Sequence, residues 1–245
     1  MPASEARSAS RTARERVRRA LTNEIKEVAL AQLASGGGTA LSLRAIAREM
    51  GMASSALFRY FRTRDALLTA LIIDSYSSLA QAAEAAEAVV HEKSVEDRWV
   101  AICRGVRSWA VAHPHEYALI FGSPIPGYSA PPGTVEPASR VPLLLGDLLR
   151  DLVTGGTYVV GAHPEPSAQV QRALDPVRAV MPAGVPYDLM VRGLMAWTYL
   201  FGALSFEMFG HRHNVIADYD VFFDHEVRRL AAMLGLVDQS PEQAR

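Results

Sequence analysis

Residues 42–71 of the chain read SLRAIAREMGMASSALFRYFRTRDALLTAL, and this stretch decides the fold of the N-terminal part. Two short apolar repeats are separated by a glycine and followed by an aromatic cluster, a basic pair and the start of a longer repeat. A helix-turn-helix has this layout, in which the second helix enters the major groove of DNA and the first crosses the backbone. The pattern therefore predicts a helix-turn-helix.

The first helix of the pair is predicted to start at residue 43. Ser42 suits its N-cap because a serine hydroxyl accepts a hydrogen bond from a first-turn amide. The apolar residues that recur at helical spacing on one face are Leu43, Ile46, Ala47 and Met50. Gly51 then follows, and glycine readily takes the positive φ that ends a helix and turns the chain.

The second helix is expected to begin at Ser54 or Ser55 and to carry the aromatic cluster through Phe61. A third helix is expected to open at Arg64-Asp65, with Thr63 as its cap. An acidic residue in the first turn suits the positive end of the helix dipole.

Residues 14–74 resemble the DNA-binding domain of the TetR family of bacterial transcriptional regulators. The matching runs are Leu43-Arg44-Ala45-Ile46-Ala47, Gly51-Met52, Ala56-Leu57-Phe58-Arg59-Tyr60-Phe61 and Arg64-Asp65-Ala66-Leu67-Leu68. Three positions depart from the family: Ala53 replaces a Ser or Thr cap, Phe58 a Tyr and Arg64 a Lys. The resemblance implies a sequence-specific DNA-binding regulator, a repressor, that acts on palindromic double-stranded operator DNA.

Roles follow for the side chains that would face DNA. The residues expected to contact phosphates are Ser42, Tyr60 and Arg64. The candidates for base edges are Ser54, Ser55, Leu57 and Arg59, of which Arg59 suits guanine O6 and N7. Arg44 could serve either purpose, and Phe58 is included although it lacks the hydroxyl that a Tyr would offer.

Positive charge is confined to one end of the chain. Residues 1–64 contain 12 Lys and Arg against 5 Asp and Glu, a balance of +7, whereas the remainder has 13 against 21, a balance of −8. A basic end on a nearly neutral protein is the electrostatic footprint of a phosphate-binding face. The charge pattern therefore favours DNA binding over an ordinary helical hairpin in a core.

The domain organisation is expected to follow this division. Residues 1–13 are predicted to be a disordered basic arm, because they have little apolar surface to bury. The arm either adds nonspecific DNA contacts or is a solvated tail. The remaining expected parts are a helix-turn-helix domain at 14–64, an effector-binding and dimerisation domain at 65–237, and a frayed tail at 238–245.

Composition indicates a soluble globular protein of 245 residues, with 49% hydrophobic and 21% charged residues. No run approaches the ~20 apolar residues needed to span a bilayer, so no membrane partner is expected. The single cysteine, Cys103, excludes an intrachain disulfide framework and fits a reducing cytoplasm. We interpret Cys103 as a small buried hydrophobe.

The pattern beyond residue 73 stays helical, so the predicted class is all-α. The expected helices are 65–90, 95–112, 115–121, 138–153, 187–209 and 220–235, with a weaker one within 167–180. The segment 123–137 is rich in Pro and Gly and is expected to be a loop. The run 157–160 is β-prone but too short to anchor a sheet.

Residues 113–122 and 197–202 are similar to a TetR subgroup whose C-terminal region is named for a W-H-G signature. Phe201 stands where that motif has His, so no histidine role is carried over. TetR relatives pair through their last two helices, which implies a homodimer matched to a palindromic operator. The residues assigned to the interface are Gly193, Ala196, Leu200, Leu204, Met208, Val227, Leu230 and Leu234. The alternative is that these faces bury within their own domain.

A set of aromatic side chains is spread over helices that could surround a cavity. Pockets between bundle helices hold small ligands, so a small-molecule effector of largely apolar character is expected. The residues assigned to the pocket are Trp99, Trp109, Tyr117, Phe121, Trp197 and Phe201. The alternative is that they are core residues. No cofactor and no metal are expected.

An enzyme is the hypothesis from another class, in the form of a small helical metal- or ligand-binding protein. Its candidate groups are His113, His115, Glu116, His163, His211, His213, Asp218, Asp220 and Asp224. No G-x-S-x-G, H-E-x-x-H or G-x-G-x-x-G pattern is present, and histidines two positions apart diverge on a helix. The sequence therefore disfavours an enzyme.

Overall fold

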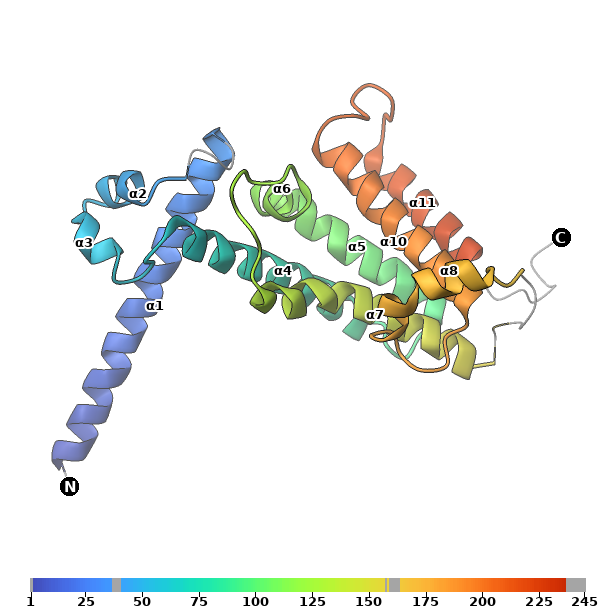
Figure 1. Ribbon diagram of the computed structural model, residues 1–245, viewed down its shortest axis with the longest axis horizontal. Helices are drawn as coiled ribbons and strands as arrows, with labels where there is room; N and C mark the ends of the chain where they lie inside the picture. Colours follow the sequence, from blue (N-terminus) through green and yellow to red (C-terminus); the bar gives the residue numbers. More distant parts are fainter. Residues whose placement is uncertain (1, 37–40, 157, 159–163, 237–245) are drawn as a thin grey trace. The chain divides into compact units, whose positions relative to one another are not determined.

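The computed structural model of the chain describes residues 2–36, 41–156, 158 and 164–236. These residues form helices and no strand, which confirms the predicted all-α class (Figure 1). The elements are α1 (Pro2–Gly36), α2 (Leu43–Glu49), α3 (Ser54–Leu57), α4 (Arg64–Ala88), α5 (Val95–Ala112), α6 (Pro114–Phe121), the 3₁₀ turn η2 (Pro132–Thr134), α7 (Val135–Thr154), α8 (Ala168–Ala173), α9 (Asp175–Arg178), α10 (Tyr187–Met208) and α11 (Tyr219–Leu234).

The chain divides into two compact units. The first comprises Met1–Ser75 and His115–Thr134, and the second comprises Tyr76–Pro114 and Val135–Arg245. These bounds differ from the expected division at residue 64, because the first turns of α4 and the whole segment after α5 belong with the helix-turn-helix. The expected tail at 238–245 lies outside the described residues.

Helix α1 begins at Pro2, where a disordered arm had been expected to extend through residue 13. Every residue from 13 to 20 is exposed, whereas Ile25 and Ala29 farther along α1 are fully buried. Residues 13–20 of α1 are therefore solvent-exposed, and the C-terminal part of the helix packs into the first unit.

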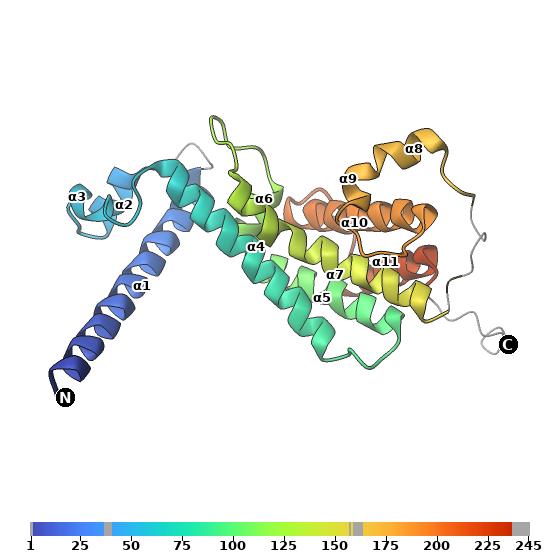
Figure 2. The same cartoon turned by 60° about the horizontal axis from the view of Figure 1, so that its bottom comes forward.

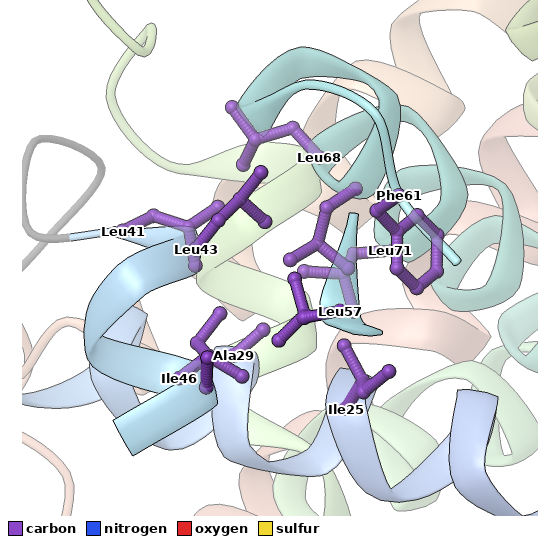
Figure 3. Packing of buried hydrophobic residues seen from close by; sticks show 11 residues of the cluster. Ile25, Ala29, Leu41, Leu43, Ile46, Leu57, Phe61, Leu68 and Leu71 are labelled. Atoms are coloured by element: carbon purple, nitrogen blue, oxygen red, sulfur yellow. The ribbon is translucent and has the colours of Figure 1, made fainter. Parts of the chain in front are cut away.

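The core of the first unit joins α1, α2, α3 and the start of α4. Figure 3 shows Ile25 and Ala29 of α1 beside Ile46 of α2 and Leu57 of α3, with Leu68 of α4 above them. Burying large aliphatic side chains contributes about 1.5–3 kcal/mol each. This cluster therefore fixes the positions of the short helices α2 and α3 relative to α1.

The segment 115–134, which contains the predicted helix 115–121 and most of the predicted loop 123–137, packs onto the same core. Leu119, Ile125 and Tyr128 contact the cluster, and the hydroxyl groups of Tyr128 and Thr69 lie 2.9 Å apart. Residues 122–131 form no helix or strand, as predicted, but the loop is anchored to the core by the partly buried Ile125 and Tyr128.

The second unit is built around α5, which packs against α7, α10 and α11 (Figure 2). Ser94 caps α5, as its hydroxyl accepts from the Asp97 amide at 3.1 Å. α5 buries Trp99, Ile102 and Val106 among its core residues.

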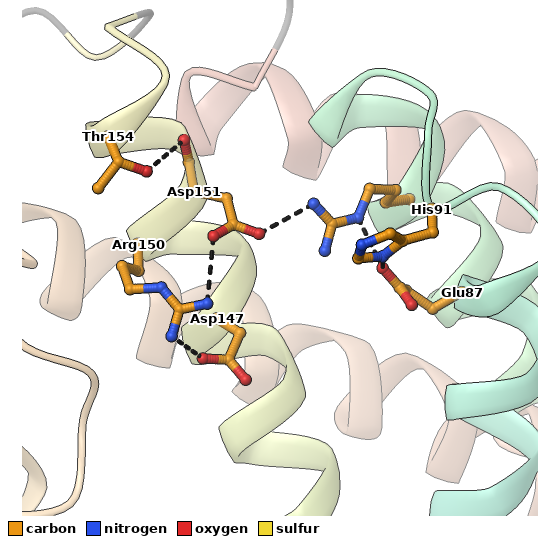
Figure 4. A network of polar contacts seen from close by, with 7 residues as sticks. Glu87, His91, Asp147, Arg150, Asp151 and Thr154 are labelled. Atoms are coloured by element: carbon orange, nitrogen blue, oxygen red, sulfur yellow. Dashed lines mark hydrogen bonds and ion pairs between the residues drawn. The ribbon is translucent and has the colours of Figure 1, made fainter.

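A polar network joins the end of α4 to α5 and α7 (Figure 4). The Arg98 guanidinium donates to Glu87 at 2.7 Å and to Asp151 at 2.9 Å, and His91 lies 2.7 Å from Glu87. Arg150 donates to Asp147 and Asp151 at 2.5 and 3.2 Å. Each buried charge in the network therefore has a partner of opposite sign.

A second buried pair ties α10 to α11. Arg192 donates to Asp188 at 2.9 Å and to the carbonyl oxygens of Met233 and Leu234 at 3.0 and 2.9 Å. Tyr158 also donates to Asp188, at 2.6 Å. Burial and this carboxylate raise the pKa of Tyr158 to about 12.

Helices α4 and α10 are long and apolar enough to cross a membrane by length and composition alone. The core helices of soluble proteins meet the same criterion, and both helices bury residues in the compact units. Their apolar character is therefore no sign of a membrane.

Candidate DNA interface and ligand pocket

The turn between α2 and α3 has the geometry that its sequence predicts. Ser42 caps α2, because its hydroxyl accepts from the Ala45 amide at 3.4 Å. Gly51 has φ +64°, and the Gly51 and Met52 amides donate back to the carbonyl oxygens of Arg48 and Ala47. This paired pattern is a Schellman motif, and it needs glycine for conformation, since a Cβ there would meet no atom within 4 Å.

Helix α3 is shorter than expected and ends at Leu57. Its N-cap is Ala53, which offers no side-chain hydrogen bond. The next residues continue as a tight turn, in which the Arg59 and Tyr60 amides donate to carbonyl oxygens three residues earlier. The aromatic cluster therefore follows the helix in a 3₁₀-like turn.

The start of α4 is capped as predicted. The Thr63 hydroxyl accepts from the Ala66 amide at 3.0 Å, and Asp65 occupies the first turn. The Arg64 guanidinium lies 3.4 Å from the Asp65 carboxylate. The cap fixes the start of α4 and therefore the position of Arg64, its first residue.

Most of the residues proposed to contact DNA are accessible. The exposed ones are Arg44, Ser55, Phe58 and Arg59, and the half-buried ones are Ser42, Ser54, Tyr60 and Arg64. Within the described part of the chain, the Arg59 guanidinium forms neither a hydrogen bond nor an ion pair. It is therefore available to an external acceptor.

Leu57 is the exception and corrects the prediction. We expected it to reach a base edge, but its side chain is 0% exposed and packs between α1 and α4 in the core of the first unit. An apolar residue in a short helix of this kind can either face the core or contact a base, and the sequence pattern does not distinguish the two. The burial of Leu57 shows that it faces the core.

A groove of about 670 Å³ runs between the exposed part of α1 and α3. Arg14, Arg18 and Arg59 line it, and the Arg18 guanidinium carbon lies 5.9 Å from the centre of the Tyr60 ring. That distance is at the limit of a cation–π contact. Arg14 and Arg18 appeared in the sequence only as part of a basic N-terminal stretch, and a helix places them beside α3.

Two family models match the chain. One is described as bacterial regulatory proteins of the tetR family and matches residues 25–71, and the other is a tetracyclin repressor-like C-terminal domain that matches residues 99–230. Together they cover more than half of the chain and both of its units. The chain belongs to the TetR family.

Curated relatives agree with this assignment. The HTH-type transcriptional regulators Rv1816 of Mycobacterium tuberculosis and Mb1846 of Mycobacterium bovis are each 37% identical to this TetR-family protein over 222 residues. The match covers 86% of this chain and 91% of theirs. The protein is thus a TetR-type, DNA-binding transcriptional regulator with a helix-turn-helix.

Solved structures share its fold. The crystal structure of regulatory protein SCO4313 has a TM-score of 0.74 and 33% identity, over 89% of this chain and 98% of that one. A tetR-family regulatory protein from Rhodococcus RHA1 has a TM-score of 0.61 at 15% identity, over 89% and 98% of the two chains. The second likeness concerns the fold alone.

The second unit of this TetR-family protein contains a pocket of about 290 Å³. Its lining comes from α5, α7, the α9 region, α10 and the end of α11: Trp99, Pro142, Leu143, Leu145, Gly146, Leu149, Pro176, Val177, Val180, Met181, Gly193, Leu194, Trp197 and Leu234. Trp99 and Trp197 had been assigned to the pocket from the sequence. The α7 and α9 residues were missed, because their apolar pattern is equally that of a core.

The other four aromatic residues assigned to the pocket lie elsewhere. Trp109 is buried, donates to the Ser78 hydroxyl at 2.9 Å and stacks on His113. Tyr117 and Phe121 belong to the first unit, where their rings are 5.0 Å apart. Phe201 is buried with its ring 5.9 Å from Trp197. None of the four lines this pocket: Trp109, Tyr117 and Phe201 are buried and Phe121 is half-buried, so a ligand contact of these residues stays a prediction.

Most of the residues assigned to the dimer interface are buried within the second unit. They are Ala196, Leu200, Leu204, Val227, Leu230 and Leu234, while Gly193 lines the pocket and Met208 is half-buried. Their burial corrects the expectation that this face of α10 and α11 meets a partner.

The opposite face of α10 is exposed and apolar. Met195, Tyr199, Gly202 and Phe206 recur there at i, i+4, i+7 and i+11, and we call them the outer stripe of α10. A Cβ at Gly202 would meet no atom within 4 Å, so no described residue packs closely enough to require glycine there. On α11, Val221 and Phe222 are exposed as well.

The groups considered for an enzyme are dispersed or already paired. Arg107 donates hydrogen bonds to Asp220 and Glu207, and Arg104 donates to Asp224. The Asp218 side chain caps α11. Among the described residues, no three of His, Cys, Asp and Glu gather as a metal site, and His163 lies outside them.

Proposed function

We propose that the protein is a cytoplasmic homodimeric repressor that binds a palindromic operator and whose DNA binding is modulated by a small, largely apolar molecule in the second unit. The observation that carries the DNA part is Arg59, which is exposed beside Ser55 and Phe58 and has no ion-pair partner among the described residues. It lies on a turn that the core of the first unit holds in place. Arginine in the major groove suits guanine O6 and N7.

Phosphate contacts are assigned to the rim of this surface. Ser42 keeps a hydroxyl proton to donate while its oxygen caps α2. Tyr60, Arg64 and Arg44 lie in the same unit, and the groove adds Arg14 and Arg18. These contacts would position the protein without reading sequence.

The outer stripe of α10 supports the homodimer. Exposed aromatic and Met side chains are typical of interface cores, and a small residue in the stripe allows two helices to approach closely. A two-fold pair of identical stripes would place two recognition turns on the two halves of a palindrome.

The pocket supports the effector. It is enclosed by α7 and α10, and α10 also carries the outer stripe on its other face. A ligand that favours one packing of α10 would shift the population of dimer geometries and so change operator affinity.

The test is footprinting of purified protein on the DNA upstream of its own gene, against random DNA at physiological salt. We expect a protected palindrome that the double variant Arg59→Ala/Tyr60→Ala no longer protects. Arg172→Ala removes an exposed arginine from α8 in the second unit and serves as the control, with protection unchanged.

Selection of binding sites from random-sequence DNA extends this test beyond one promoter. Recovery of one palindromic consensus would support the proposal. Weak, salt-sensitive binding to every sequence would contradict it, because that behaviour reports phosphate contacts without base contacts.

A further inference from the structure

The pocket of the second unit restricts the chemistry of the molecule that it can hold. We propose that this molecule is uncharged and mainly hydrocarbon, and that it carries a hydrogen-bond acceptor that meets the indole N–H of Trp197. The inference rests on the proposed function and deepens it by naming the chemical class of the effector.

The lining excludes a charged ligand. Among the described residues that line the pocket, every side chain is a hydrocarbon, a thioether or an indole. A buried charge without a partner costs far more free energy than buried hydrocarbon. A carboxylate or an ammonium group would therefore enter at a large penalty.

One charged side chain beside the lining is already neutralised. Arg192 precedes the lining residue Gly193, but its terminal nitrogens are occupied by Asp188 and by the carbonyl oxygens of Met233 and Leu234. Its Nε has no partner among the described residues, yet Arg192 is not part of the lining. An anion would thus gain Arg192 only by breaking the Arg192–Asp188 pair. Arg178, which follows the lining residue Val177, is not part of the lining either and donates to the carbonyl oxygen of Val185.

The lining offers two side-chain donors, and one of them is used. The Trp99 indole donates to the carbonyl oxygen of Val227 at 2.8 Å. The Trp197 Nε1 is buried and has no hydrogen-bond partner in the described part of the chain, so a ligand reaches it only by displacing the side chains that cover it. A buried donor left unsatisfied costs about 1–3 kcal/mol, so an acceptor brought by the ligand would recover this loss.

The polarity of that contact is fixed by chemistry. An indole N–H donates and cannot accept, so the matching ligand group is a carbonyl, ether or ester oxygen. The rest of the ligand meets only apolar side chains. A ketone or ester on a hydrocarbon frame fits both requirements.

The pocket also limits size. Its volume of about 290 Å³ lies near the lower end of the range for ligand pockets, about 300–1,000 Å³. Two glycines allow its walls to approach. A Cβ at Gly193 would stand 2.6 Å from the Leu149 side chain, and one at Gly146 would stand 2.8 Å from Met181 Sδ. The ligand is therefore small.

The experiment titrates the full-length protein, without DNA, with octan-2-one, octanoate and octane, and follows tryptophan fluorescence. We expect octan-2-one to bind most tightly, by about three- to tenfold over octane for one added hydrogen bond. Octanoate should bind most weakly. Tightest binding by octanoate, or binding by none of the three, would overturn the proposal.

Two variants separate the N–H group from the cavity. Trp197→Phe keeps an aromatic ring and should lower octan-2-one affinity to that of octane, leaving octane affinity unchanged. Val177→Phe should abolish all binding by filling the pocket, whereas Val170→Phe on α8 lies off the lining and should not. An unchanged preference for the ketone in Trp197→Phe would disprove the role of the N–H.

The same proteins are then assayed on operator DNA, so that the two proposals fail in different ways. Ketone binding without a change in operator affinity would contradict the effector role and leave the ligand class standing. Failure of the wild-type protein to bind DNA would contradict the proposed function, while the titrations would still decide the ligand class.

Discussion

Leu57 and Arg59 lie two positions apart, but Leu57 is buried in the core and Arg59 is exposed at the surface. Leu57→Ala should lower the free energy of unfolding of the first unit by about 2–5 kcal/mol, because it removes a fully buried side chain. Arg59→Ala should change it by less than about 0.5 kcal/mol, since the group is exposed. Urea unfolding followed by circular dichroism measures both.

For operator affinity we expect the opposite order, with a larger effect from Arg59→Ala than from Leu57→Ala. Arg59→Ala is expected to cost about 1–3 kcal/mol of binding and to relax the preference at one base pair. Leu57→Ala should keep its sequence preference at temperatures where it stays folded. An equal loss on every sequence would make Arg59 a phosphate contact instead.

Cys103 is buried in α5, and burial raises the pKa of its thiol well above the usual value. Because the thiolate is the reactive form, a disulfide reagent such as Ellman's reagent should label native protein very slowly and unfolded protein at once. Rapid labelling of the native protein would contradict this placement. The sequence predicted this role correctly, since a lone Cys stood among apolar residues.

At the scale of the element, α10 shows where sequence reasoning reached its limit. Its bounds were predicted to within one residue, because apolar residues continue through the whole helix. Because apolar residues occur on every face of the helix, the sequence did not show which face is buried. In the structure Leu200 and Leu204 face the core, while Met195 and Phe206 face solvent. Periodicity identifies a core face only when the other face is polar.

Helix α3 shows a different limit. The sequence predicted its start at Ser54 and the glycine turn that precedes it, because both depend on neighbouring residues. It did not predict that the helix ends at Leu57, since the packing of Leu57 and Phe61 against α1 and α4 determines that turn. Of the residues that line the pocket, the sequence predicted only Trp99 and Trp197. The residues from α7 and α9 were missed because tertiary packing, and no local pattern, brings these helices together.

The outer stripe of α10 carries an oligomerisation prediction. Phe206→Glu should convert a dimer to a monomer by placing a charge within the apolar contact. Val111→Glu on α5, whose residue has the same exposed fraction of 53%, is the matched control and should stay dimeric. Light scattering during size-exclusion chromatography reports the mass.

At the scale of the whole molecule, the network in Figure 4 links acid stability to folding. Burial alone would raise the pKa of Glu87, but the hydrogen bonds from His91 and Arg98 outweigh it and the net shift is downward. Asp151 is lowered in the same way, by Arg98 and Arg150 against its own burial. The unfolded chain therefore binds more protons than the folded chain in the acid range.

Stability contributed by these carboxylates is complete above the ordinary carboxyl pKa, about 4, and is lost as the pH falls through the lowered folded values. Glu87→Gln should lower stability at pH 7 and flatten its decline below about pH 5. Thermal unfolding from pH 7 to pH 3 tests this. A variant with a decline as steep as that of the wild type would contradict the role of Glu87.

Helices α8 and α9 bury no residue within their bounds, yet the α9 region supplies one wall of the pocket through Pro176, Val177 and Val180. A segment with so few buried contacts opens at a small cost in free energy. Molecules would thus enter and leave the pocket quickly without unfolding of α5, α7 or α10. Because the ligand would dissociate quickly, the occupancy of such a regulator follows the current concentration of its effector and falls soon after the effector is removed.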